Sequence, residues 1–159
     1  MREVINIKQN ISVSVKAAVV KDDSVLLVEY VDHVGLHYNL PGGKVKNGES
    51  LREAVLRKVY KETCLKVEVV KMMFVVEYVP DKWNGEFGDQ QKVQFQFLCK
   101  ALPGSHPKIP NPPDENQTGV RWVKIDDIDK VFLLPRIGKK LKIALNEELT
   151  RSDALVDKW

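Results

Sequence analysis

The residues of this sequence that could do chemistry are concentrated in a glycine-rich segment, residues 42–50, and in the charged stretch after it. Glycines that lead into a helix bring backbone N–H groups and the positive end of the helix dipole together, which suits an anionic ligand. The charged stretch contains Lys58, Lys61 and Glu62. Carboxylates bind divalent cations, whereas lysines bind phosphate oxygens directly. These residue types together predict phosphate chemistry, either through a metal ion or through lysine.

The spacing of these residues resembles the Nudix box. The pattern of that family is Gly, five residues, Glu, seven residues, and then Arg-Glu-apolar-x-Glu-Glu-x-Gly-apolar. The residues of this chain that match the pattern in register are Gly43, Glu49, Arg57, Val59, Glu62 and Leu65. Three positions differ from it, because Lys58 and Lys61 stand where the family has Glu and Cys64 stands where it has Gly. Similar flanking segments extend the resemblance over residues 11–148.

The resemblance implies a fold, a reaction and a set of site residues. The implied fold is α+β, a Nudix-type α/β/α sandwich with a mixed central sheet, in which a single domain spans residues 1–159 and residues 149–159 form a loose C-terminal tail. The implied reaction is hydrolysis of a pyrophosphate in a nucleotide-type small molecule, with Mg²⁺ or Mn²⁺ as cofactor. The implied site comprises the catalytic residues Glu62, Arg57 and Glu49, the substrate-binding residues Lys58, Lys61, Gly42, Gly43 and Tyr38, and the metal ligands Glu62 and the Gly42 carbonyl.

The two lysines in the box alter its electrostatics. At 3.6 residues per turn, Lys58, Lys61 and Glu62 fall in a sector of about 120° together with small and apolar residues, so all three are expected to face inward. A unit charge pair at about 4 Å is worth roughly 4 kcal/mol at an effective dielectric near 20, and a divalent ion beside one lysine would feel about twice that as repulsion. We therefore expect that Glu62 alone cannot form the metal cage of the family.

Two hypotheses follow for the function. In the first, Glu62, the Gly42 carbonyl and one further carboxylate hold an ion, and the protein is a weak or narrow hydrolase that cleaves the pyrophosphate of a nucleoside diphosphate linked to another group. The candidates for that further carboxylate are Asp89, Glu86, Glu77 and Glu115. In the second, the lysines bind phosphate directly, and the protein is a non-catalytic nucleotide-binding or regulatory module. The two hypotheses stand near parity, with a slight preference for the enzyme.

Several residues of the site also have structural interpretations. Arg57 could pair with Glu53 at i,i+4, and Lys58 could form an ion pair with Glu62 that replaces a lost metal site. A non-glycine residue at position 64 is expected to adopt a left-handed conformation at a cost of about 1–2 kcal/mol. The aromatic residues that could stack on a nucleobase are Tyr38, Trp83 and Phe87, whereas Phe95, Phe97 and Trp122 are expected in the core.

The elements that must position these residues can be read from periodicity and turn signals. Ser50 and Glu53 have the form of a capping box, which predicts a helix over residues 51–64. The other predicted elements are a hairpin of residues 11–20 and 25–31, a loop with a short central strand at 32–50, strands at 67–79 and 92–99 joined by a loop at 80–91, an irregular segment at 103–119, a strand at 119–123, a helical turn at 125–130 and a helix at 136–148.

Composition bounds the class of protein. The chain has 159 residues, of which 43% are hydrophobic and 30% charged. That composition excludes collagen-like, disordered and disulfide-scaffold proteins. No apolar run is long enough to cross a bilayer, and two distant cysteines indicate a reducing cytoplasm. The net charge of +3 does not by itself imply nucleic acid as a partner. A homodimer would be unsurprising.

Overall fold

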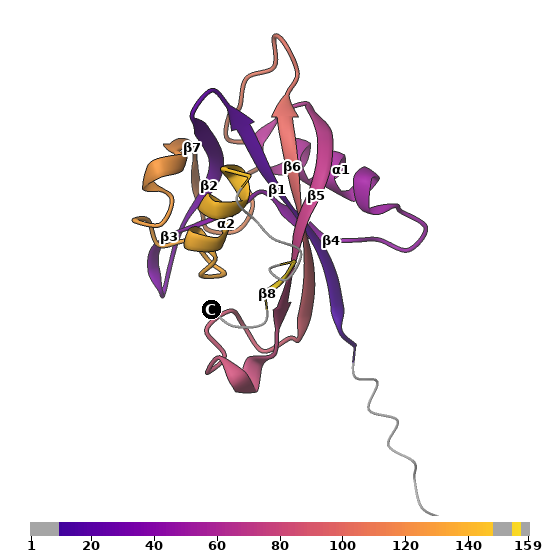
Figure 1. Cartoon of the computed structure of the whole chain (residues 1–159), viewed down its shortest axis with the longest axis vertical. Coiled ribbons are helices and arrows are strands. Elements are labelled where there is room, and N and C mark those ends of the chain that lie inside the picture. The colour runs from indigo at the N-terminus through magenta and orange to yellow at the C-terminus, as the bar shows by residue number, and fades with distance from the viewer. Residues whose placement is uncertain (1–9, 148–153, 157–159) are drawn as a thin grey trace, which may run out of the picture.

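The computed structural model describes residues 10–147 and 154–156, and within them the chain forms a mixed sheet with helices on both faces (Figure 1). The strands are β1 (Ser12–Lys21), β2 (Ser24–Asp32), β3 (Gly35–Asn39), β4 (Gly42–Lys44), β5 (Val67–Tyr78), β6 (Lys92–Ala101), β7 (Gln117–Lys124) and β8 (Leu155–Val156). The helices are α1 (Leu51–Thr63) and α2 (Gly138–Leu145), with 3₁₀ turns η1 (Pro80–Lys82) and η2 (Ile125–Asp127). The predicted α+β sandwich with a mixed central sheet is confirmed.

The strand order is β3-β2-β1-β6-β5-β8, with β4 paired to β1 and β7 paired to β2. The β1–β6 and β5–β8 pairs are parallel, and the other pairs are antiparallel. β1 and β2 pair only next to their turn, where Val20 lies opposite Val25. Beyond that point the two strands separate, and β4 takes the place beside β1, with Gly42 opposite Lys16. The sheet is therefore split at the level of Lys16, and the split leaves room for side chains from other elements.

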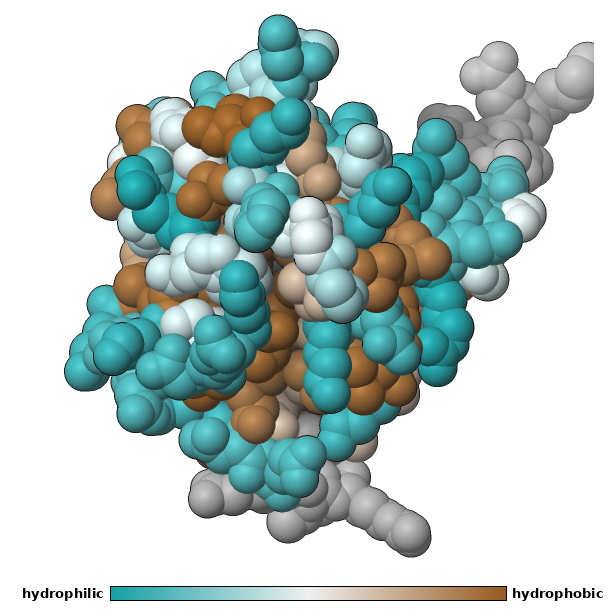
Figure 2. Space-filling view, turned by 90° about the horizontal axis from the view of Figure 1, so that it is seen from above, coloured by the Kyte–Doolittle hydropathy of each residue, from teal (hydrophilic) through white to brown (hydrophobic). Residues whose placement is uncertain are grey.

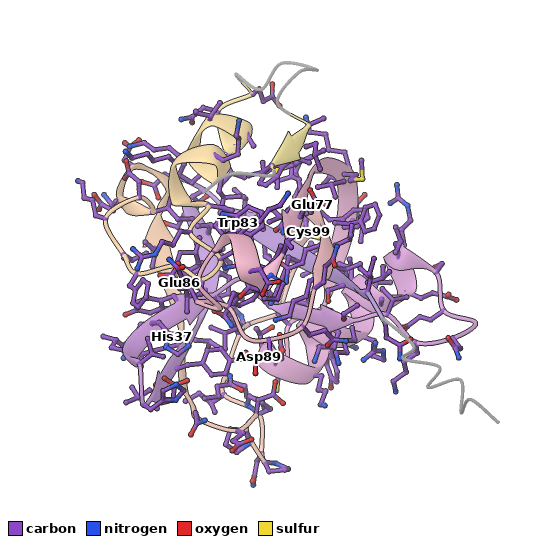
Figure 3. All side chains as sticks on the ribbon, turned by 90° about the horizontal axis from the view of Figure 1, so that it is seen from below. His37, Glu77, Trp83, Glu86, Asp89 and Cys99 are labelled. Atoms are coloured by element: carbon purple, nitrogen blue, oxygen red, sulfur yellow. The ribbon has the colours of Figure 1, made fainter. Side chains whose placement is uncertain are left out.

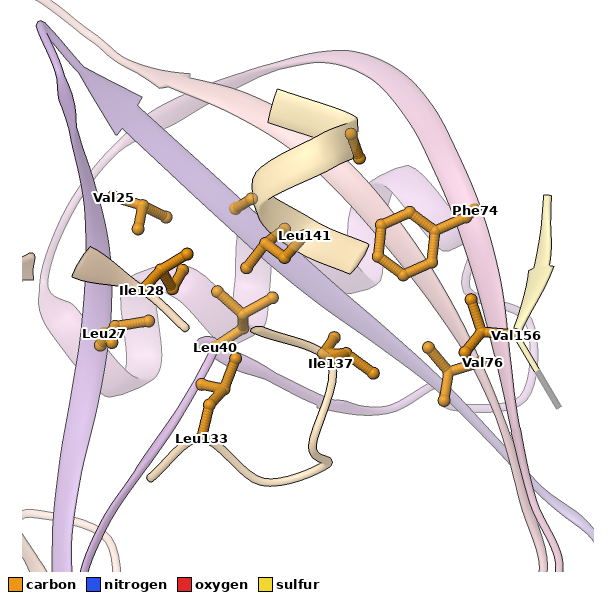
Figure 4. Close-up of a cluster of buried hydrophobic side chains, with 12 residues drawn as sticks. Val25, Leu27, Leu40, Phe74, Val76, Ile128, Leu133, Ile137, Leu141 and Val156 are labelled. Carbon is orange, nitrogen blue, oxygen red and sulfur yellow. The ribbon is translucent and has the colours of Figure 1, made fainter. Parts of the chain in front are cut away.

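Each face of the sheet has its own hydrophobic core. The core beneath α1 includes Val15, Val55 and Phe97. The core beneath α2 includes Phe74 and Leu141, and Figure 4 shows Leu141 directed from α2 toward the sheet. The alternation of side chains along β1 and β6 explains this division, since successive residues of a strand point to opposite faces. Phe95 and Trp122 are partly buried against the α1 core, so the predicted core placement of the aromatic residues is confirmed.

Helix α1 begins and ends as the sequence predicts. The Ser50 hydroxyl accepts from the Glu53 amide at 3.2 Å, and the Glu53 carboxylate accepts from the Ser50 amide at 2.7 Å. This reciprocal pair is the capping box. At the other end Cys64 has φ 57° and ψ 12°, and its amide donates to the Tyr60 carbonyl. The predicted left-handed residue at position 64 is confirmed.

Several boundaries differ from the prediction. The segment 32–50 contains two short strands, β3 and β4, rather than one, because each pairs with a longer neighbour that a local pattern does not identify. α2 is shorter than the helix predicted at 136–148. Of the segment expected to be a tail, residues 155–156 form β8, pair in parallel with β5 and bury Val156 in the α2 core. Residues 149–153 and 157–159 lie outside the described residues.

Among the described residues, none of the helices is both long and apolar enough to pass through a bilayer. On the face seen in Figure 2, apolar side chains lie in separate patches among hydrophilic ones.

Candidate functional site

The centre of the candidate site is Glu62, in the last turn of α1. Only 5% of its surface is exposed. Its Oε2 accepts from the Gly42 amide at 2.7 Å, and its Oε1 lies 3.3 Å from the Lys58 Nζ, one turn earlier on the helix. The Lys58 side chain is itself only 14% exposed. The box thus places an ammonium group and a carboxylate together against the glycine-rich loop, as the sequence analysis proposed for an ion pair.

Two residues that the sequence analysis did not single out complete this cluster. Lys16 is buried on β1, and its Nζ donates to the Leu40 carbonyl at 3.3 Å. Asp114 lies in the loop before β7, where its carboxyl group is close enough to that of Glu62 to raise the pKa of Glu62. We call Lys16, Lys58, Glu62 and Asp114 the split-sheet cluster, because they meet where β1 and β2 separate.

The position of Asp114 is set by a short turn. The Gln117 amide donates to the Asp114 carbonyl at 3.0 Å, and the Asp114 amide donates to the Gln117 Oε1 at 3.1 Å. The Gln117 Nε2 then donates to the Glu62 backbone carbonyl at 2.9 Å, which ties this turn to the end of α1. The neighbouring Glu115, one of the four predicted candidates for a further carboxylate, is exposed. Only the turn geometry distinguishes these two adjacent acids.

Burial dominates the electrostatics of the split-sheet cluster. It raises the pKa of Glu62, an effect that Lys16 and Lys58 oppose and that the Asp114 carboxyl group reinforces. Burial also lowers the pKa of Lys16, against the attraction of Glu62. Two lysines thus lie beside two acidic side chains in a largely buried place, where charges interact strongly.

Further lysines surround this cluster. Lys92, at the start of β6, has its pKa lowered to about 8 by burial and by the charges of Lys16 and Lys44. Its Nζ donates to the Phe87 carbonyl at 2.8 Å and lies 4.0 Å from the centre of the Phe87 ring. These lysines add positive charge around Lys16 and Lys58. An anionic group is therefore the ligand that this region attracts most strongly.

Two glycines of the loop lie in close contact with their neighbours. A Cβ at Gly42 would lie 2.1 Å from the Val15 carbonyl oxygen on β1. A Cβ at Gly43 would lie 2.3 Å from the Lys58 Cε, so any side chain there would displace Lys58. Both glycines therefore let the loop approach the helix and the sheet closely enough for the Gly42 amide to reach Glu62.

The pair Arg57 and Glu49 holds the glycine-rich loop to α1. The Arg57 Nη2 donates to the Glu49 Oε2 at 2.9 Å and to the Lys44 carbonyl at 3.0 Å. The Lys46 amide donates to Glu49 at 2.9 Å. The hydrogen bonds from Arg57, and then the one from Lys46, lower the pKa of Glu49 to about 2. Arg57 therefore orients a carboxylate of the box, and its partner is Glu49 rather than Glu53.

Two expected site residues lie elsewhere. Lys61 is exposed, so the expectation that it faces inward with Lys58 and Glu62 is wrong; it lies at the edge of the sector, on the solvent side of the helix. Tyr38 donates to the Glu29 Oε2 at 3.3 Å, beside Arg121. The tyrosine that lies near Glu62 and Asp114 is Tyr30, on the opposite face of the same strand pair.

The remaining candidate carboxylates do not join Glu62. Glu86 pairs with Arg136. Figure 3 shows Glu86 and Asp89 apart from each other in the loop between β5 and β6, while Glu77 belongs to β5. Within residues 10–147 and 154–156, no group of three or more His, Cys, Asp or Glu side chains is arranged to hold a metal ion. With one neighbouring carboxyl and two ammonium groups, the donors around Glu62 do not fit a divalent cation.

Comparison with known proteins identifies the family. The model of the NUDIX domain matches residues 11–143. The chain belongs to the NUDIX family. Its fold is similar to that of a MutT NUDIX hydrolase from Burkholderia pseudomallei, with 27% sequence identity and a TM-score of 0.67 over 89% of this chain and 99% of that one.

Two solved structures of lower sequence identity show the same fold. An ADP-ribose pyrophosphatase from Streptococcus suis is 20% identical, with a TM-score of 0.64 over 94% of this chain and 100% of that one. A MutT protein from Methanosarcina mazei is 19% identical, with a TM-score of 0.70 over 91% of this chain and 99% of that one. At these identities the likeness concerns the fold. The activity must be argued from the site of this chain.

Proposed function

We propose that this NUDIX protein binds the diphosphate of a nucleotide-type ligand through Lys16 and Lys58, without the metal cage of its family. The observation that carries the proposal is the Lys58–Glu62 contact of 3.3 Å at the centre of the box. In this arrangement an ammonium group stands where the family pattern has a metal-binding carboxylate. Lysine is an effective point-charge ligand for phosphate, but it does not generate the hydroxide that attacks phosphorus.

The charge and burial of the cluster support this proposal. A diphosphate brought to Lys16 and Lys58 replaces part of the interaction of the lysines with Glu62, and the raised pKa of Glu62 limits repulsion from its carboxyl group. The ammonium groups are largely buried, so their attraction for an anion is screened less than that of exposed lysines. Lys61 is exposed and has no part in this binding site.

The proposal predicts metal-independent binding. In buffer with EDTA, isothermal titration calorimetry is expected to detect binding of inorganic pyrophosphate and of nucleoside diphosphates. Lys58→Met should weaken the affinity for both ligands by about tenfold or more, because it removes a buried charged contact. The matched control is Lys61→Met, because Lys61 is on the same helix but exposed. It should change neither affinity by more than about twofold. Lys16→Met provides a second test from a different strand. Equal affinities in all four proteins would refute the proposal.

A second candidate function is slow hydrolysis of the same class of ligand. Two observations favour it: Asp114 supplies a second carboxyl group beside Glu62, and Arg57 still orients Glu49. The test is to incubate the protein with nucleotide sugars, dinucleoside polyphosphates and nucleoside triphosphates in Mg²⁺ or Mn²⁺, and to measure released phosphate products. Turnover that Glu62→Gln abolishes would support the enzyme. Turnover that appears only in Lys58→Glu/Lys61→Glu would support the binding protein.

A further inference from the structure

A row of buried polar side chains continues from the split-sheet cluster along the sheet. On β1 the row consists of Ser12, Ser14 and Lys16, and on β6 it consists of Gln94 and Gln96, all with less than 9% of their surface exposed. The parallel register places Ser14 beside Gln94 and Lys16 beside Gln96. All five side chains are on the face opposite α1, since they alternate with Val15 and Phe97 of the α1 core.

The pattern of this row is the reverse of that of a core strand. Ser12 and Ser14 are buried, whereas Val13 between them is 43% exposed on the other face. A strand whose inner face served only for packing would place the valine inside and the serines outside. The polar face has apolar neighbours, because β5 places Val76 beside Gln94 and Phe74 beside Gln96. The inner face here is suited to a ligand that needs hydrogen bonds as well as apolar contact.

Three amide atoms of the row lack hydrogen-bond partners within the described chain. Gln96 is completely buried, and neither its Oε1 nor its Nε2 has a hydrogen-bond partner. Gln94 is 2% exposed, and its Oε1 also has none. An unsatisfied buried polar atom costs about 1–3 kcal/mol. β6 carries three such atoms here, and this cost is removed when a ligand supplies donors and an acceptor.

We infer that Gln94 and Gln96 recognise the base of the nucleotide whose diphosphate lies at Lys16 and Lys58. An amide presents a donor and an acceptor side by side, which matches the hydrogen-bonding edge of a nucleobase. Lys16 is the direct neighbour of Gln96 in the register, so the phosphate end and the base end of one ligand meet in a single continuous row. Val76 and Phe74 supply apolar contact for the ring.

This inference rests on the proposed function, and the binding experiment separates the two. Titrations in EDTA would use ADP, GDP, CDP and UDP as base-bearing probes and inorganic pyrophosphate as the probe without a base. We expect the wild-type protein to prefer one base. Gln96→Met, which keeps the volume but removes the amide, should reduce that preference by about tenfold or more and leave pyrophosphate affinity unchanged. Gln94→Met should act in the same direction.

The matched control is Gln90→Met, because the Gln90 amide donates to the Asn10 carbonyl at 3.4 Å outside the row. It should leave both preference and pyrophosphate affinity as they are. An unchanged base preference in Gln94→Met and Gln96→Met would overturn the inference. The two amides would then be hydrogen-bond partners of buried water rather than of a base. Absence of pyrophosphate binding in the wild-type protein would instead overturn the proposed function. A melting temperature measured for each variant confirms that it is folded.

Discussion

At the scale of single residues, the three departures from the NUDIX box have different consequences. Lys58 replaces a carboxylate with an ammonium group that contacts Glu62, which changes what the site attracts. Lys61 replaces a carboxylate on the solvent side of the helix and leaves the split-sheet cluster unaltered. Cys64 keeps the left-handed backbone of the glycine it replaces, with φ 57°, and carries the steric cost of a side chain there.

Cys64→Gly is therefore expected to stabilise the protein by about 0.5–1 kcal/mol, since the relief of strain exceeds the added entropy of the unfolded chain. For a chain of this size that corresponds to a rise in melting temperature of about 1–4 °C, which calorimetry can measure. Cys64→Ala serves as the control, because it removes the thiol and keeps the Cβ. A glycine variant no more stable than the alanine variant would contradict the assignment of strain.

At the scale of elements, the site depends on the point where α1 begins. The capping box at Ser50 sets the first residue of the helix, and the later positions then follow by turn geometry, so that Lys58 and Glu62 reach the glycine-rich loop. The Arg57–Glu49 pair joins the same loop to the middle of the helix. The glycine-rich loop and α1 are therefore held together, and they lie at the split between β1 and β2.

Ser50→Ala removes the acceptor for the Glu53 amide and is expected to destabilise the protein by about 1 kcal/mol. The loss should be visible in urea unfolding as a lower midpoint with an unchanged slope. Ser24→Ala is the comparison, since the Ser24 hydroxyl donates to the exposed Asp23 carboxylate and should contribute less than about 0.5 kcal/mol. Similar midpoints for the two variants would show that the cap does not stabilise α1.

At the scale of the whole molecule, Glu29 joins the strands on one side of the split. Its carboxylate accepts from Arg121 Nε at 2.8 Å and Thr118 Oγ1 at 2.9 Å on β7, and from Tyr38 on β3. A side chain at Gly119 would crowd it, with a Cβ 3.1 Å from Oε1. The hydrogen bond from Arg121 is the largest cause of the lowered pKa of Glu29. This group of contacts holds β2, β3 and β7 together beside the site.

Glu29→Gln is expected to destabilise the protein by about 1–2 kcal/mol at pH 7, because it removes charge-assisted hydrogen bonds. A carboxyl whose pKa is lowered by folding stabilises above its ordinary pKa of 4.5, and that stabilisation is lost as the pH falls through the folded-state pKa. The difference between variant and wild type should therefore shrink below about pH 4.5. Urea unfolding at several pH values measures this difference in the free energy of unfolding, with Glu115→Gln at an exposed position as the control. A difference independent of pH would contradict this role.

The features that local sequence predicts are those with a local physical cause. The α1 boundaries follow from a capping box whose members are three residues apart, and the left-handed Cys64 follows from the position where such a helix must stop. The contact between Lys58 and Glu62 follows from a spacing of four residues on a helix. The family resemblance extended these predictions to the α+β sandwich as a whole.

The sequence alone could not identify the partners that come from far along the chain. Lys16 and Asp114 are separated by the length of most of the fold, and they meet at Glu62 only because β1 and β2 diverge and a turn tied by Gln117 closes over the helix end. Tyr38 was predicted at the site and Tyr30 was not, because the face of the paired strands β2 and β3 that turns toward Glu62 is decided by the sheet.

By itself the sequence determined which segment forms the glycine-rich loop and the helix after it, because hydrogen-bonding and steric constraints within a few residues act before any tertiary contact exists. Only the tertiary structure decided the charge around Glu62 and the polar row on the inner face of β1 and β6. Both depend on burial, which changes the energy of every charge and amide, and burial is a property of the packed sheet rather than of any one segment.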